Sequence, residues 1–415
     1  MQQKSLGIWS LPVLVGALGY FVDIYDLLLF SIIRVPSLQS LGLSPQQIAE
    51  QGLYIINLQM IGLLVGGFFW GVLGDKMGRM KVLFASIIMY SLGNIANGFA
   101  QTVEQYAWIR FFTGIGLAGE LGASITLISE LLPKNKRGIG TSLVAGIGLL
   151  GAVVAFFMKE WFVNPTTGEG WRICYFIGGG MGFLLLFLRV GVLESSLFHS
   201  LQHKKVKKGS LWLLFSKPTY LKKYVLAILI GLPSWYCIGI LITFSKEFGE
   251  KMGITETIDP GKAVMFAYAA LSAGDICSGF ISQFFQSRKK AVLFFYLITA
   301  LGIGLYFSNW DNTANYLYVA CTVLGFGTGF WAMFVTMAAE QFGTNIRATV
   351  TTSVPNMVRG SLNLISMLFV YLQLSMSYIQ SGIITGITVL VIALIALYLT
   401  EETYHKDLDY LDGMG

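Results

Sequence analysis

Apolar windows long enough to cross a lipid bilayer recur along this chain. A membrane-spanning helix needs about 20 mostly apolar residues. Only 12% of the 415 residues are charged, whereas soluble domains are about a quarter charged. A water-soluble enzyme is therefore excluded, and we expect an all-α membrane protein with twelve transmembrane helices. The predicted spans lie near 11–37, 52–73, 81–101, 106–131, 138–158, 172–193, 221–245, 263–286, 290–308, 315–341, 348–374 and 382–400.

Basic residues gather in the loops after the even-numbered spans, whereas the odd-numbered loops are acidic. Because Lys and Arg are retained on the cytoplasmic side, this pattern predicts cytoplasmic N- and C-termini in a plasma (inner) membrane. The net charge of +6 thus indicates topology and contact with lipid headgroups, and no nucleic acid is expected as a partner. The basic clusters are Lys76, Arg79 and Lys81; Lys134, Lys136 and Arg137; Lys204, Lys205, Lys207 and Lys208; Arg288, Lys289 and Lys290; and Arg347.

The two halves of the chain echo each other. Glu130 and Arg137 close the fourth span, and Glu340 and Arg347 close the tenth at the same offset. Two parallel repeats around a site at the bilayer midplane are typical of transporters that work by alternating access. We expect an N-terminal six-helix bundle over 1–193, a basic cytoplasmic linker over 194–220, a C-terminal six-helix bundle over 221–400 and a solvated cytoplasmic tail over 401–415.

The turn between the second and third spans carries the most specific motif. Its sequence, Gly71-Val-Leu-Gly-Asp75-Lys-Met-Gly78-Arg79-Met-Lys81, resembles the G-x-L-a-D-r-x-G-r-k signature of the major facilitator superfamily. The resemblance implies a cytoplasmic gate built from charges at span ends. As plain helix-end charges, the same residues could equally satisfy helix dipoles and lipid phosphates. The gate candidates are Gly71, Asp75, Gly78, Arg79, Lys81, Glu130, Arg137, Glu194, Glu340 and Arg347.

A second resemblance narrows the branch of that superfamily. The segment Arg110-Phe-Phe-Thr-Gly-Ile-Gly-Leu-Ala-Gly-Glu120 is similar to the metabolite:proton symporters and the sugar porters, and its final Gly-Glu pair leans towards the metabolite branch. The second half departs from the pattern, because 287–290 lacks the acid of the first motif and Gly343 stands where the family often has Pro. The fifth span lacks the Gly-Pro of drug:proton antiporters, so efflux is a lesser alternative.

Charged residues inside predicted spans are candidates for function, since an ionised group near mid-bilayer is costly unless it is paired or hydrated. Asp23 and Asp26 share one face of the first span. In the symporters that the chain resembles, a first-span acid pairs with the fourth-span Arg and is released on protonation. We therefore assign proton coupling to Asp23, Asp26, Arg110 and Glu120, with Asp23 slightly preferred over Asp26. A static salt bridge, and a packing role for Glu120, are the alternatives.

The eleventh span holds the most informative residue for substrate recognition. Arg359 lies there with Asn356 and Asn363 expected on the same helix face. A guanidinium flanked by amides suits bidentate recognition of a carboxylate, although Arg359 could instead pair with an acid of the first or fourth span. Further polar or aromatic residues that could complete the pocket are Tyr20, Asn57, Gln59, Trp235, Tyr236 and Trp331.

Together these features predict a proton-coupled symporter that imports a small hydrophilic organic solute, either a carboxylate or a zwitterion. A sugar or polyol symporter is the main alternative. The sequence has no H-E-x-x-H motif that would indicate an enzyme, and all three His residues lie outside the predicted spans, which argues against a metal site. We expect a monomer in a lipid bilayer, a small-molecule substrate and a proton as partners, and no cofactor.

Overall fold

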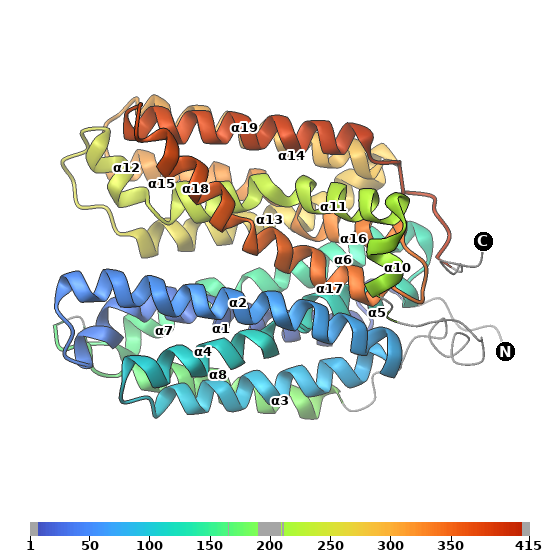
Figure 1. Ribbon diagram of the computed structural model, residues 1–415, viewed down its shortest axis with the longest axis horizontal. Helices are drawn as coiled ribbons and strands as arrows, with labels where there is room; N and C mark the ends of the chain where they lie inside the picture. Colours follow the sequence, from blue (N-terminus) through green and yellow to red (C-terminus); the bar gives the residue numbers. More distant parts are fainter. Residues whose placement is uncertain (1–6, 165, 190–208, 210, 409–415) are drawn as a thin grey trace.

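The computed structural model describes residues 7–164, 166–189, 209 and 211–408. The described helices run nearly parallel to one another in two groups, one mainly from each half of the chain (Figure 1). The start of α1 (Leu11–Ser40) and the end of α19 (Tyr378–Leu399) lie at the same end of the molecule. We call this the terminal end, and the opposite end the far end.

Helices account for almost all of the described chain. The first half contains α1, α2 (Pro45–Met77), α3 (Arg79–Gly98), α4 (Val103–Leu117), α5 (Glu120–Leu131), α6 (Lys134–Leu149), α7 (Gly151–Phe162) and α8 (Trp171–Arg189). The second half contains α10 (Leu211–Ser216), α11 (Pro218–Tyr236), the π-helix η1 (Cys237–Ile242), α12 (Ser245–Lys251), α13 (Pro260–Phe285), α14 (Arg288–Ser308), α15 (Ala314–Gly327), α16 (Trp331–Gln341), α17 (Arg347–Gly360), α18 (Leu362–Leu372) and α19.

These helices make twelve spans, because α4 and α5, α6 and α7, α11 and η1, α15 and α16, and α17 and α18 follow one another across short breaks. Among the described residues, ten spans are long and apolar enough to cross a membrane by themselves. The remaining two are α3 and the α17–α18 pair. α17 is polar because it lies inside the protein, where most of its side chains are buried and contact other helices instead of lipid.

The breaks within spans are not predicted from hydropathy, which registers only mean apolarity. Most of them separate two helices at a turn, as at Ser361 between α17 and α18 and at 328–330 between α15 and α16, whereas η1 follows α11 directly. Discontinuous spans of this kind expose backbone groups and helix ends in the middle of the protein, where transporters place their binding sites. The residues beside these breaks are therefore candidates for a binding site.

The two halves meet where α2, α5 and α6 pack against α13, α16 and α17. Small residues allow this close approach. A Cβ atom added to Gly122 in α5 would lie 2.3 Å from Cα of Thr352 in α17, and one on Gly71 in α2 would lie 2.7 Å from Cα of Thr349. Side chains at these two glycines would force the halves apart.

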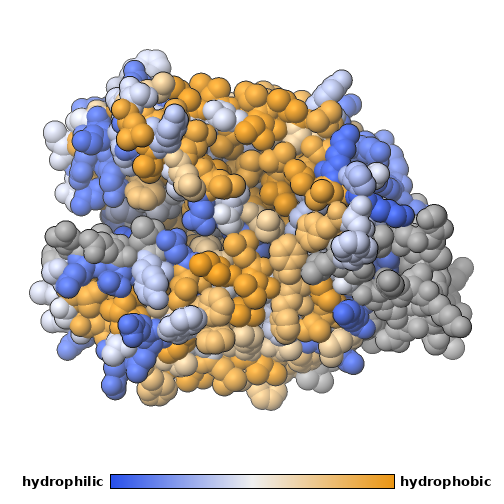
Figure 2. All heavy atoms as spheres, viewed as in Figure 1, coloured by the Kyte–Doolittle hydropathy of each residue, from blue (hydrophilic) through white to orange (hydrophobic). Residues whose placement is uncertain are grey.

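The outer surface is apolar around its middle. Figure 2 shows hydrophobic residues in a broad band between more hydrophilic ends. Large apolar side chains such as Leu364, Leu374 and Tyr398 are strongly exposed. Such a surface would be unstable in water but matches the hydrocarbon core of a bilayer. The protein is therefore an integral membrane protein.

We predict that Gly122→Leu lowers the stability of the purified protein by at least about 1–3 kcal/mol, because the new side chain clashes with backbone atoms across the boundary between the halves. Thermal unfolding in detergent measures the effect. Gly304→Leu serves as the control, since nothing lies within 4 Å of a Cβ added at Gly304. Equal melting temperatures for the two variants would contradict the proposed close packing.

Candidate functional site

A cluster of buried charges joins the two halves at the terminal end. Arg79 Nη2, from α3, donates to Glu130 Oε1 at 2.8 Å, and Arg347 Nη1, from α17, donates to the same oxygen at 3.0 Å. Both arginine side chains and that of Glu130 are fully buried. Glu130 belongs to the first half and Arg347 to the second, so this carboxylate holds the halves together.

Asp75 makes a second connection between the halves, of a different kind. Its Oδ1 accepts the N–H of Ala348 at 3.0 Å, and its Oδ2 accepts the N–H of Thr349 at 2.9 Å and the Thr349 hydroxyl at 2.7 Å. These groups form the start of α17. A carboxylate at a helix N-terminus satisfies free N–H groups and complements the helix dipole, so Asp75 caps a helix of the opposite half.

The corresponding cluster of the second half centres on Glu340. Arg288 Nη2 lies 3.0 Å from Glu340 Oε1, and Arg137 Nη1, from the first half, lies 3.3 Å from the same oxygen. The Thr403 hydroxyl donates to Glu340 Oε2 at 2.7 Å. Arg288 was expected only as part of a basic loop, but here it takes the place that Arg79 has beside Glu130.

The segment 401–408 lies across both clusters. It is therefore not a solvated tail, in contrast to what was expected from the sequence. Arg347 Nη2 donates to the carbonyl of Leu408 at 2.8 Å, and Arg137 Nη1 donates to that of Lys406 at 3.3 Å. The side chains of Thr403, Tyr404 and Leu408 are buried. We call residues 401–408 the strap, since it contacts arginines of both halves.

Glu402 fixes the start of the strap. Its carboxylate accepts hydrogen bonds from the Ser287 hydroxyl and from the N–H of Arg288, at the beginning of α14. Burial by itself would raise the pKa of Glu402, but these hydrogen bonds outweigh it and hold the pKa below its ordinary value. Glu402 is therefore ionised at neutral pH and caps α14.

The other gate candidates have different positions. Gly78 has φ 107°, a conformation that favours glycine, and turns the chain from α2 into α3. Gly71 lies against α17. The Lys81 side chain is exposed, so the expectation that it holds two bundles together is not met by any contact in the described part of the chain. Glu194 lies outside the described residues.

Ending the chain after Thr400 removes the strap, and we predict that the terminal end then opens more often. Hydrogen bonds from charged groups are worth about 1.5–3 kcal/mol each, so amide exchange in residues 342–349 should rise about tenfold or more. Hydrogen–deuterium exchange with mass spectrometry measures this. A chain ending after Leu408 keeps the strap and is the control; equal exchange in both truncated proteins would show that the strap does not stabilise closure.

Inside the first half, Arg110 is paired with Asp26. Arg110 Nη1 donates to Asp26 Oδ1 at 2.7 Å, its Nη2 donates to the Asp26 carbonyl at 3.0 Å, and its Nε donates to Gln59 Oε1 at 3.3 Å. The slight preference for Asp23 as the partner of this arginine is thus not met. Gln59, expected in a substrate pocket, instead helps to orient Arg110.

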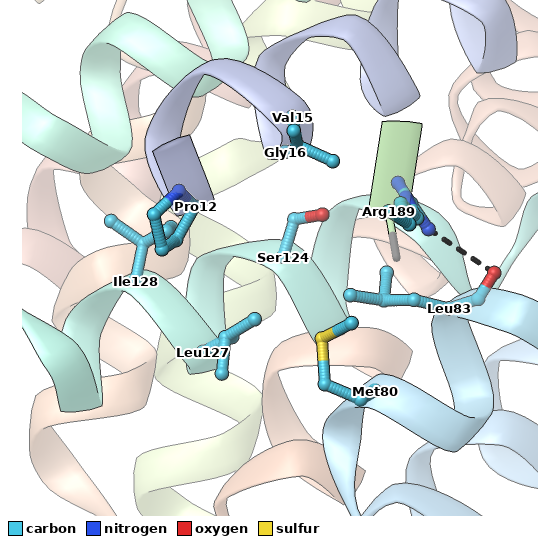
Figure 3. Close-up of a pocket in the computed structure, with 9 residues that line it drawn as sticks. All are labelled: Pro12, Val15, Gly16, Met80, Leu83, Ser124, Leu127, Ile128 and Arg189. Carbon is cyan, nitrogen blue, oxygen red and sulfur yellow. Dashed lines mark hydrogen bonds between the residues drawn. The ribbon is translucent and has the colours of Figure 1, made fainter. Parts of the chain in front are cut away.

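A second buried pair links Glu120 with Arg189 at the end of α8. Arg189 Nη1 donates to Glu120 Oε2 at 3.1 Å and to the Leu83 carbonyl at 3.1 Å. Figure 3 shows Arg189 and Ser124 beside a small pocket between α1, α3 and α5. Arg189 was not predicted as a functional residue. Its position as an arginine within a predicted span was the signal that could have identified it.

Asp23 lies in the middle of the protein, among other buried charges. Its side chain is fully buried, and neither carboxylate oxygen has a hydrogen-bond partner among the described residues. Arg359 and Glu120 are near enough to interact with it electrostatically. Burying a carboxylate without a hydrogen-bond partner costs free energy. Binding of a proton or of a substrate group at Asp23 would remove this cost.

Arg359 faces Asp23 from the second half. Its Nη1 donates to Asn356 Oδ1 at 3.1 Å and its Nη2 to the Tyr20 hydroxyl at 3.4 Å, while the guanidinium lies 5.7 Å from the centre of the Trp331 ring. Arg359 is only 4% exposed, and its Nε has no partner among the described residues; the same is true of Trp331 Nε1. The arginine thus has unused donors beside an aromatic face.

Asp275, in α13, belongs to the same region but was not singled out from the sequence. Its Oδ1 accepts the N–H of Ala332 at 2.9 Å, next to Trp331, and its Oδ2 has no partner in the described residues. Tyr20 interacts electrostatically with Arg359, Asp23, Tyr268 and Asp275. We call Tyr20, Asp23, Asp275, Trp331 and Arg359 the central site.

Several predicted pocket residues lie elsewhere. Tyr236 donates its hydroxyl to the carbonyl of Gly382 at 2.6 Å, so it packs within the second half. Trp235 is part of the hydrophobic core. Asn57 is exposed, and so is Asn363, because the break at Ser361 ends the face that it was expected to share with Arg359. Asn356, in contrast, contacts Arg359 as expected and bonds the Ala118 carbonyl at 3.3 Å.

Twelve spans in two matching halves, ion pairs that close one end and unpaired charges in the middle are features of a secondary transporter. The family model for the Major Facilitator Superfamily matches residues 16–367. The chain belongs to this family, and it is a transporter and not an enzyme.

Two curated relatives are similar over most of their length. The niacin transporter NiaP of Acinetobacter baylyi is 25% identical over 366 residues, which cover 80% of each chain. The cis,cis-muconate transport protein of the same bacterium is 24% identical over 373 residues and 86% of each chain. These two relatives take their names from small organic acids, or compounds related to them.

The fold also agrees with a solved structure. A proton:xylose symporter bound to 6-bromo-6-deoxy-D-glucose matches with a TM-score of 0.78 over 96% of this chain and 97% of that chain, at 17% identity. A likeness at this identity concerns the fold alone. It confirms the predicted fold class of twelve transmembrane helices in two six-helix bundles.

Proposed function

We propose that this protein imports a small organic carboxylate together with a proton, across the plasma membrane and with both termini in the cytoplasm. The observation that carries the proposal is Arg359, a buried guanidinium that contacts only neutral groups among the described residues and keeps unused donors. Guanidinium groups present paired donors that match a carboxylate. The names of the relatives, niacin and muconate transporters, support the same class of substrate.

The aromatic residues of the central site favour a planar substrate. The Trp331 ring lies beside the guanidinium of Arg359, and the Tyr20 hydroxyl approaches it from the opposite half. An aromatic face next to a bidentate donor can hold a flat carboxylate by stacking while the arginine binds its oxygens. Residues from both halves would then contact one substrate, as alternating access requires.

Coupling to a proton follows from the proximity of Asp23 and Arg359. An ionised Asp23 attracts the guanidinium and repels an incoming carboxylate, since the two anions compete for one cation. Protonation of Asp23 removes the competing charge and leaves Arg359 free for substrate. Substrate and proton would therefore bind together, and neither would bind well alone.

The gate described above supports the proposed direction of access. In this conformation, the clusters at Glu130 and Glu340 and the cap at Asp75 close the terminal end. If the terminal end is cytoplasmic, as the basic loops suggest, this conformation is closed towards the cytoplasm. Opening would require these ion pairs to separate, and occupation of the central site would bias that step.

We predict that Arg359→Gln weakens binding of the transported carboxylate by at least about tenfold, since a charge-assisted hydrogen bond contributes about 1.5–3 kcal/mol. A metabolite panel screened by thermal shift identifies ligands, and counterflow in proteoliposomes measures affinity. Arg172→Gln is the matched control, because Arg172 bonds the Ala100 carbonyl far along α8 from the terminal end. Unchanged affinity, or neutral sugars outcompeting organic acids, would refute the carboxylate assignment.

Asp23→Asn imitates the protonated carboxyl, and we expect it to abolish accumulation driven by a pH gradient while counterflow continues. The variant should also fold normally, because Asp23 has no hydrogen-bond partner to lose in the described structure. Asp26→Asn provides the contrast: it leaves buried Arg110 without its ionic partner, which costs about 3–5 kcal/mol. Gradient-driven accumulation by Asp23→Asn at the wild-type level would exclude Asp23 as the coupling group.

A further inference from the structure

Asp275 is a buried carboxylate that neither the gate nor the proposed proton coupling uses. It lies in the middle of α13, fully buried. The turn between α15 and α16 brings the N-terminus of α16 to it, and Oδ1 accepts the Ala332 N–H at 2.9 Å. The neighbouring residue Trp331 has its ring beside Arg359. Asp275 is therefore anchored to the backbone segment that also places an aromatic wall of the central site.

Helix capping accounts for only one of the two carboxylate oxygens of Asp275. A capping interaction needs one acceptor oxygen, which Asn or Ser would supply without a charge. The second oxygen, Oδ2, is buried and has no partner among the described residues. A buried anion with an unused oxygen is costly unless something else binds it. The capping bond thus fixes the carboxylate in place and leaves Oδ2 available.

The charges of the central site are unbalanced in the described structure. Asp23 and Asp275 are acidic and Arg359 is basic, whereas Asp26 and Glu120 are already matched by Arg110 and Arg189. If Asp23 takes a proton and Arg359 binds a substrate carboxylate, Asp275 is left as the one acid of the central site without a counter-charge. A positive charge on the substrate would neutralise it.

We propose that Asp275 binds a cationic nitrogen of the substrate, so that the transported carboxylate is a compact zwitterion held between Arg359 and Asp275. This inference rests on the proposed function and specifies its substrate. Arg359 lies beside the Trp331 ring, and Asp275 accepts the N–H of the next residue, Ala332, so the two anchors belong to one site. Opposite charges at the two ends of the site would orient the substrate and reject acids that lack the nitrogen, since they leave Asp275 unpaired.

Two pairs of matched probes test the inference. The 3- and 4-(aminomethyl)benzoates carry a carboxylate and an ammonium, whereas 3- and 4-ethylbenzoates have the same shape without the positive charge. Their affinities for the purified full-length transporter are measured by calorimetry or by competition against a ligand found in the panel. We expect the wild-type protein to prefer at least one aminomethylbenzoate over its ethyl counterpart by about tenfold or more.

The decisive variant is Asp275→Asn, which keeps an acceptor for the Ala332 N–H and removes the charge. It should lose the preference for the aminomethyl probe while it binds the ethyl probe at least as well as the wild-type protein, and the retained binding shows that it is folded. Ser272→Ala, one turn away on α13 and bonded to the Gly146 carbonyl at 2.6 Å, should keep the wild-type preference.

Other outcomes overturn the inference. A preference that survives in Asp275→Asn, or a wild-type protein that favours the ethyl probes, would show that Asp275 does not bind the nitrogen. Equal loss of both probes in a variant with a normal melting temperature would assign Asp275 to holding α16 alone. If the wild-type protein binds organic acids through Arg359 but does not distinguish the pairs, only the zwitterion inference fails; if Arg359→Gln has no effect, the proposed function fails as well.

Discussion

Two carboxylates, Glu130 and Glu340, each receive arginines from both halves of the protein, and the closed terminal end depends on them. A buried charge is tolerated only when opposite charges and hydrogen-bond donors surround it. Each glutamate here meets this condition only while the halves are together, because one of its arginines belongs to the opposite half. Closure and charge neutralisation are therefore a single event.

The cost of burying a charge also explains which charged groups are paired within one half and which lie in the central site. The ion pairs Asp26–Arg110 and Glu120–Arg189 each lie within one half, so they can move with it as rigid units. The central site, in contrast, contains two acids that no arginine of their own half pairs with in the described structure, Asp23 and Asp275, and each has a carboxylate oxygen without a hydrogen-bond partner there. Ion pairs within a half thus hold each bundle together, whereas the acids of the central site are left for the substrate and proton of the proposed mechanism.

Much of the gate could be predicted from the sequence, because its residues sit at the ends of spans in a repeated motif. Repetition of Glu130 and Arg137 as Glu340 and Arg347 indicated that these charges act together, although not that each glutamate binds the arginine of the other half. The central site was harder to predict. Hydropathy locates a span but not its rotation, so Asp23 and Asp26 could not be separated, and Asp275 was overlooked in a span of ordinary apolarity.

Local breaks account for the remaining errors. Asn363 follows Arg359 by one helical turn in the sequence, yet the interruption at Ser361 places it on a different helix. Such breaks depend on packing between helices, which no single span records. The strap was missed for a related reason: it binds Arg137 and Arg347 through its own backbone carbonyls at Lys406 and Leu408, and backbone acceptors carry no sequence signature.

The strap also has a consequence for how the protein is made and handled. Its residues leave the ribosome after the twelve spans described above, so the closed terminal end is completed only once residues 401–408 have been synthesised. A chain that ends before residue 401 would contain all twelve of these spans and the whole central site but lack the strap. For the same reason, a fusion partner joined directly to residue 408 would begin next to the carbonyl that Arg347 binds, and we expect an attachment at that point to disturb the closed end that it is meant to report on.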